Sequence, residues 1–149
     1  MSGGSEYKLK ILIIDDNEDD FETMKRATKK IDFPCILEWR DSGQKGYDYL
    51  SGIIKNNNHR DLPNIIFLDI NMPGLDGKQT LDLIKKNTLL CSIPVLMFTT
   101  SGNDKDIKDC YGLGASSYIQ KPHSYEDLIK IFRIIDQYWL DVSALPKIC

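Results

Sequence analysis

Acidic, hydroxyl and basic side chains stand at the ends of four short apolar runs of the sequence. In chain order they are Asp15 and Asp16, then Asp69, Thr99 and Lys121. Carboxylates brought together repel one another, and a hard divalent cation such as Mg²⁺, which takes oxygen ligands, offsets that repulsion. A carboxylate in such a place can act as a nucleophile and form an aspartyl-phosphate. A lysine and a threonine hydroxyl would then bind the phosphoryl oxygens, so these residue types indicate phosphoryl transfer to Asp69.

The apolar runs alternate with segments of helical periodicity. We expect strands over 8–14, 35–39, 65–68, 95–98 and 117–120, and helices over 21–31, 46–54, 78–86, 104–111 and 125–139. Strands that alternate with helices predict an α/β fold in which a parallel sheet is covered on both faces. Right-handed crossovers leave few topologies, and the economical one is a doubly wound, flavodoxin-like sheet with strand order 2-1-3-4-5.

This topology predicts where the polar strand ends meet. Small ligands bind beyond the carboxyl ends of the strands, where the direction of winding reverses. In the order 2-1-3-4-5 that point lies between strands 1 and 3, so Asp15, Asp16 and Asp69 are expected to meet there. Thr99 and Lys121 are expected on the same rim.

The bulk composition excludes several classes of protein. The chain has 149 residues and a formal net charge of −3, which argues against a non-specific nucleic-acid binder and against a polybasic membrane patch. Neither a membrane-spanning stretch nor a hydrophobic signal core is present, so we expect a cytoplasmic location. The four cysteines and two histidines lack zinc-type spacing, and reduced thiols are expected. Cys91 and Cys110 are expected to serve as small apolar residues.

Plainer interpretations exist for the same residues. Asp15 and Asp16 could simply cap the first helix. The run DDNEDD suggests a calcium loop, but its sixth position is Asp20 instead of Gly and its twelfth is Arg26 instead of Glu. Lys121 could be a solvated lysine, and Tyr118 a plain strand aromatic. Taken together, the residues at successive strand ends favour a shared site over these separate explanations.

Four segments of the chain resemble the receiver domain of two-component response regulators. They are ILIIDDNEDD, NIIFLDINMPGLDG, IPVLMFTTS and GASSYIQKP. The resemblance covers roughly residues 8–138. It implies that Asp69 is the phosphoacceptor, that Asp16 binds Mg²⁺ directly and Asp15 largely through water, and that Asn71 offers the metal a backbone carbonyl.

The resemblance also implies a switch. The Thr99 hydroxyl would reorient when Asp69 is phosphorylated, and Tyr118 would follow it between exposed and buried positions. Lys121 would bind the phosphoryl group, and the family usually joins this lysine to Pro122 by a cis peptide bond, which X–Pro bonds tolerate.

The function that the resemblance implies is a phosphoacceptor switch that assists its own phosphorylation and dephosphorylation, and not an enzyme. The phosphoryl group would come from a sensor histidine kinase or a phosphotransfer protein, and output would pass through protein contacts without a DNA-binding domain. Two alternatives remain. Aspartate-nucleophile phosphatases resemble D-x-D, but Asn71 stands at the second acid and cannot protonate a leaving group. A receiver that serves as a scaffold without phosphorylation is the other.

The end of the chain carries a finer resemblance. The segment YWLDVSALP and the long loop over 55–63 are similar to regulators that serve bacterial phytochromes. The apolar residues of this tail need a cover, either on their own domain or in a homodimer formed through strand 4, strand 5 and the last helix. We expect residues 1–7 to be a disordered lead, 8–140 the receiver domain, and 141–149 a C-terminal extension.

Overall fold

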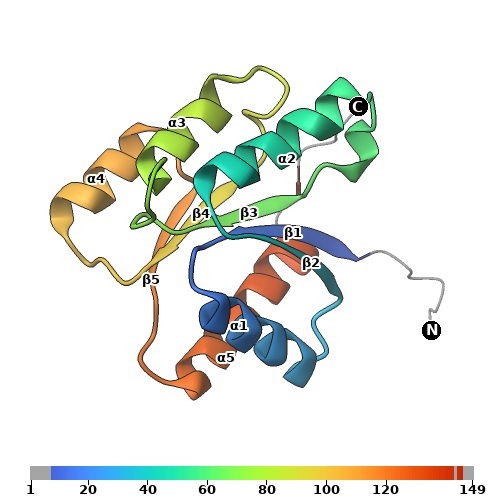
Figure 1. Ribbon diagram of the computed structural model, residues 1–149. Coiled ribbons are helices and arrows are strands. Elements are labelled where there is room, and N and C mark those ends of the chain that lie inside the picture. Colours follow the sequence, from blue (N-terminus) through green and yellow to red (C-terminus); the bar gives the residue numbers. More distant parts are fainter. Residues whose placement is uncertain (1–7, 143, 146–149) are drawn as a thin grey trace.

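Five parallel strands form one sheet in the computed structural model, which describes residues 8–142 and 144–145 (Figure 1). The strands are β1 (Leu9–Ile14), β2 (Cys35–Arg40), β3 (Ile65–Leu68), β4 (Val95–Thr99) and β5 (Ser117–Gln120). Their order is β2-β1-β3-β4-β5, and every neighbouring pair is parallel. The predicted α/β class and strand order are confirmed.

Helices cover both faces of the sheet. They are α1 (Glu18–Lys30), α2 (Gly43–Lys55), α3 (Gly77–Lys86), α4 (Asp104–Gly112) and α5 (Tyr125–Asp136), with a short 3₁₀ turn η1 (His59–Asp61) and a π-helical segment η2 (Gln137–Val142). Helices α1 and α5 lie on one face, and α2, α3 and α4 lie on the other (Figure 1).

The strands supply a separate hydrophobic core on each face of the sheet. In β1, Leu12 and Ile14 belong to the cluster under α2, α3 and α4, whereas Leu9, Ile11 and Ile13 belong to the cluster under α1 and α5. All five of these side chains are buried. Strands covered on both faces need apolar residues at consecutive positions, which is why β3 is an unbroken hydrophobic run and β1 is interrupted only by Lys10.

Capping side chains explain where the sequence-based helix boundaries were wrong. Helix α2 begins at Gly43, earlier than expected, because the Ser42 hydroxyl accepts a hydrogen bond from the Lys45 N–H at 3.1 Å. Helix α1 begins at Glu18, where the Asn17 side chain accepts from the Asp20 N–H at 3.1 Å. The expected single helix over 125–139 is instead an α-helix followed by the π-helical η2.

The end of the chain folds back in part on its own domain. Trp139 and Leu145 are partly buried and pack against the core under α1 and α5. Tyr138, in contrast, is 49% exposed. The predicted disordered lead over 1–7 lies outside the described residues, as do positions 143 and 146–149 of the predicted extension. Within the part of the chain that the structure describes, no helix is both long and apolar enough to cross a membrane.

Candidate phosphoryl-transfer site

The carboxyl ends of neighbouring strands are joined by backbone hydrogen bonds, which fix the start of each loop. The Asp69 N–H donates to the Ile14 carbonyl at 3.0 Å, and the Asp15 N–H donates to the Arg40 carbonyl at 3.1 Å. The Lys121 N–H donates to the Thr99 carbonyl at 2.6 Å. The sheet itself therefore places the predicted site residues along one rim.

Three carboxylates meet at the switch point, as predicted. Oxygens of Asp15, Asp16 and Asp69 all lie within 4.8 Å of one another. Asp15 and Asp69 are buried, while Asp16 is exposed. The Asn17 N–H donates to Asp15 Oδ1 at 2.9 Å, and the Ile70 N–H donates to Asp69 Oδ1 at 2.7 Å. These backbone donors hold the two buried side chains in fixed orientations.

The Lys121 ammonium lies among three carboxylates. Its Nζ is 2.8 Å from Asp15 Oδ2, 3.1 Å from Asp69 Oδ2 and 2.6 Å from Asp20 Oδ2. Its side chain is only 10% exposed. The solvated-lysine interpretation is therefore wrong. Asp20 was not among the predicted site residues, because no local pattern links the start of α1 to Lys121, 101 positions later.

Burial and charge act in opposite directions at this site. Burial raises the pKa of the Asp15 carboxyl above its usual value, and the hydrogen bond from Lys121 only partly opposes this. Burial alone would lower the pKa of Lys121. Its hydrogen bonds to Asp15 and Asp20 and the negative charges of Asp15 and Asp69 outweigh burial, so the pKa of Lys121 lies above its usual value. Lys121 is therefore a firmly positive group beside Asp69.

The donor set suits a hard cation. It consists of carboxylate oxygens from Asp15, Asp16 and Asp69, without nitrogen or sulfur, and oxygen ligands are those that Mg²⁺ prefers. The predicted Mg²⁺ site therefore fits the residues present. Asn71 is itself exposed and lies in the loop two positions beyond Asp69, and the role of its carbonyl stays a prediction.

The two predicted switch residues meet at Ser101. Thr99 is buried, and its Oγ1 accepts from the Ser101 N–H at 3.4 Å. The Tyr118 hydroxyl donates to the Ser101 carbonyl at 2.9 Å, and the ring is partly buried against the core under α4. The Ser101 hydroxyl in turn donates to Asp106 at 2.6 Å. The sequence-based interpretation missed this role of Ser101, because nothing in a loop serine signals which neighbours it bridges.

Two further residues next to the carboxylates were also missed. The Trp39 indole N–H donates to the Asp15 carbonyl at 2.8 Å, and its ring stacks on Phe21. Gly77 begins α3 so close to β3 that a Cβ there would collide with the carbonyl oxygen of Asp69. A side chain at position 77 would therefore displace the backbone of Asp69.

Two sequence-based expectations about neighbouring residues were wrong. The described residues contain no cis peptide bond, so Lys121–Pro122 is trans, the form that X–Pro bonds favour by roughly 0.5–1 kcal/mol. Cys91 is exposed and does not serve as a small core residue, whereas Cys110 is buried as expected. Burial raises the pKa of the Cys110 thiol to about 11.

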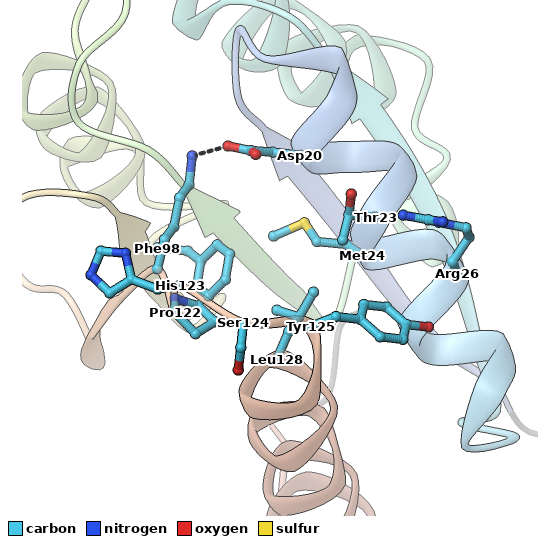
Figure 2. A pocket seen from close by; sticks show the side chains of 11 residues that line it. Asp20, Thr23, Met24, Arg26, Phe98, Pro122, His123, Ser124, Tyr125 and Leu128 are labelled. Atoms are coloured by element: carbon cyan, nitrogen blue, oxygen red, sulfur yellow. Dashed lines mark hydrogen bonds and ion pairs between the residues drawn. The ribbon is translucent and has the colours of Figure 1, made fainter.

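A pocket of about 190 Å³ opens beside Lys121, between α1 and the start of α5 (Figure 2). Met24, Phe98 and Leu128 are buried and form its apolar floor. Asp20 and Arg26 from α1 and His123 from the loop after β5 belong to its polar lining. A pocket of this volume can hold one amino-acid side chain.

Comparison with known proteins agrees with this geometry. Residues 11–133 match the family model of the response regulator receiver domain. The chain is 35% identical to the probable methanogenesis regulatory protein FilR2 of Methanothrix harundinacea over 136 residues, which are 91% of this chain and 86% of that protein. It is 32% identical to the response regulator Rcp1 of Synechocystis over 148 residues, which are 98% of this chain and 99% of that protein.

Solved structures show the same similarity. The phosphorylated cyanobacterial phytochrome response regulator RcpA is 30% identical, with a TM-score of 0.84 over 95% of this chain and 100% of that one. The Mn²⁺-bound form of Rcp1 is 31% identical, with a TM-score of 0.81 over 93% of this chain and 99% of that one.

Proposed function

The chain belongs to the response regulator receiver family, and from this premise we propose that Asp69 accepts a phosphoryl group from a phosphohistidine of a sensor kinase or phosphotransfer protein. An Asp69 oxygen attacks phosphorus, the P–N bond of the donor breaks, and its electron pair stays on the imidazole nitrogen. The observation that carries this proposal is the cluster of Asp15, Asp16 and Asp69 with the Lys121 ammonium 3.1 Å from Asp69.

The other site residues have separate roles in this proposal. Asp15, Asp16, Asp69 and the Asn71 carbonyl would hold Mg²⁺, which supplies positive charge to offset that of the phosphoryl group. Lys121 binds the phosphoryl oxygens, and Thr99 turns its hydroxyl toward them. To do so, Thr99 must release the Ser101 N–H, and Ser101 also contacts Tyr118. The proposed output is a change at the surface formed by α4 and β5.

The partner that fits best is a histidine kinase, and the similarity to Rcp1 and RcpA favours a phytochrome. We propose that the donor docks over α1 and the loop after β5, where the pocket beside Lys121 receives one of its side chains. The described cysteines are free thiols, which is typical of a reducing compartment, so the proposed location is the cytoplasm.

A homodimer through β4, β5 and α5 is the proposed assembly. On this side a groove of about 550 Å³ is lined by Ile119, Ile131, Ile134, Tyr138 and other residues. Ile134 is 64% exposed, and apolar exposure of this kind favours a protein contact. Light scattering over a concentration series tests it, and a strict monomer with and without phosphorylation would contradict it.

One experiment separates this function from its alternatives. The protein is incubated with Mg²⁺ and a small phosphodonor such as acetyl phosphate, and its intact mass is followed with time. We expect a phosphorylated species that appears and then decays, because the site assists both steps. Continuous turnover of phosphomonoesters would instead indicate a phosphatase, and the absence of any mass shift would indicate a scaffold.

A further inference from the structure

Asp20 makes the shortest of the three carboxylate contacts to Lys121, at 2.6 Å. It is also the most accessible of the three, since its side chain is 36% exposed against 2% for Asp15 and 9% for Asp69. Its backbone is fixed at the start of α1 by the hydrogen bond from its N–H to the Asn17 side chain. The contact is therefore made by a firmly placed residue.

Asp20 stands apart from the predicted metal ligands. The three clustered carboxylates are those of Asp15, Asp16 and Asp69, and Asp20 is not among them. It lies on α1 at the edge of the pocket, with its carboxylate directed at the lysine ammonium (Figure 2). Its charge thus acts on Lys121 from the first turn of α1.

The charge balance of the site makes this contact costly for an incoming phosphoryl group. Three carboxylates, those of Asp15, Asp20 and Asp69, contact the single ammonium of Lys121. A fourth, that of Asp16, lies beside Asp15 and Asp69. A phosphoryl group adds further negative charge and needs the ammonium. Asp20 neutralises part of that ammonium and also repels the phosphoryl oxygens.

We propose that Asp20 is a positioning residue that competes with the phosphoryl group for the Lys121 ammonium. The inference rests on the proposed function of Asp69. It predicts that Asp20 weakens the phosphorylated state, so that removal of its charge strengthens binding of a phosphoryl group or of an anion that mimics one.

The test uses beryllofluoride, an anion that mimics a phosphoryl group on a carboxylate, at saturating Mg²⁺. Calorimetric titration compares wild type with Asp20→Asn, Asp20→Glu and Asp19→Asn. Asp19 is the matched control, because it lies in the same first helical turn and carries the same charge but is exposed. We expect Asp20→Asn to bind at least about fourfold more tightly than Asp19→Asn, the effect of one charge at roughly 5 Å under full water screening. Asp20→Glu should stay near wild type.

A second readout reports the ion pair itself without metal or anion. The ¹⁵N resonance of the Lys121 ammonium should shift, and its protons should exchange faster, in Asp20→Asn but not in Asp19→Asn. An affinity for beryllofluoride that is equal in Asp20→Asn and Asp19→Asn, or weaker in Asp20→Asn, would overturn the competition. If wild type itself bound no beryllofluoride and took up no phosphoryl group, the proposed function would fail, and this inference with it.

Discussion

Two lysines of this protein each contact several carboxylates, but they stand in opposite surroundings. Lys121 lies between strand ends, with a side chain 10% exposed, whereas Lys78 lies on the surface between α3 and α4 and is 24% exposed. Lys78 Nζ is 2.7 Å from Asp106 and 2.9 Å from Asp109. The distances resemble those around Lys121, so the difference between the two clusters lies in their solvation.

The pKa values of one carboxylate from each cluster, Asp15 and Asp109, shift in opposite directions. Burial raises the pKa of Asp15 despite its contact with Lys121. Hydrogen bonds from Lys105 and Lys78 lower the pKa of Asp109 to about 2, because little burial opposes them. The surface cluster thus stabilises the charge of Asp109, while the buried cluster holds the charge of Asp15 at an energetic cost. Such a cost is expected at a site with the proposed function, which would bind a cation and a phosphoryl group.

The backbone carbonyl of Thr99 accepts a hydrogen bond from the Lys121 N–H, so Thr99 stands between the buried cluster and the surface cluster. Ser101 contacts both Thr99 and Tyr118, and its hydroxyl donates to Asp106, which pairs with Lys78. A rotation of the Thr99 hydroxyl toward phosphate would therefore disturb a hydrogen-bonded chain that ends at the surface of α4. This gives the proposed switch a specific route through side-chain contacts.

The largest expected effect concerns Asp69. Asp69→Asn removes the anionic nucleophile and nearly keeps its shape, so phosphorylation should disappear while the fold remains. Intact mass after incubation with acetyl phosphate and Mg²⁺ measures phosphorylation, and circular dichroism measures whether the fold remains. The surface variant Asp109→Asn is the control and should label as wild type does. Undiminished labelling of Asp69→Asn would refute the assignment of the phosphoacceptor.

A smaller effect is expected for metal binding at Asp16. Asp16→Asn removes one of few charged ligands, so Mg²⁺ affinity should fall by at least about tenfold. Titration calorimetry measures this, and Trp39 fluorescence offers a second signal because its indole contacts the Asp15 carbonyl. Equal Mg²⁺ affinity in wild type and variant would remove Asp16 from the site.

The stability cost of the buried cluster gives the third prediction. The folded-state pKa of Asp15 is raised, so its contribution to stability is greatest at low pH and is lost as pH rises above the unfolded value. At neutral pH without metal, Asp15→Asn should therefore raise the unfolding midpoint, by roughly 2–4 °C for each kcal/mol recovered. Thermal unfolding in EDTA measures it. A clear fall in the midpoint would mean that Lys121 outweighs the burial of Asp15.

The sequence predicted the strand-end residues of the buried cluster much better than the contacts that other elements make with them. The five strands and their order follow from apolar runs and from the rules for parallel sheets, and these also place Asp15, Asp69, Thr99 and Lys121 on one rim. Such residues are predictable because each directly follows or closes a strand.

The contacts that sequence analysis missed join elements far apart in the chain. Asp20 reaches Lys121 across 101 positions, and Trp39 reaches Asp15 across 24. Neither contact leaves a local pattern, since each depends on how a helix or an edge strand packs against the rim. The surface cluster around Lys78 was missed for the same reason, because it forms only when α3 and α4 lie side by side.

The smallest expected effect is at Lys78. Lys78→Met keeps the aliphatic stem and removes the charge, while Asp106 retains Ser101 and Asp109 retains Lys105 as partners. Exposed ion pairs contribute little, so the unfolding midpoint should fall by no more than about 3 °C at neutral pH. The folded-state pKa of Asp109 is lowered to about 2 and that of Asp106 is also lowered, so the stability they contribute is present above their unfolded values and is lost as pH falls. The difference between wild type and variant should therefore shrink from about pH 4 downwards, and thermal unfolding over a pH series measures it. A difference that grew toward low pH would show that Lys78 does not stabilise these carboxylates.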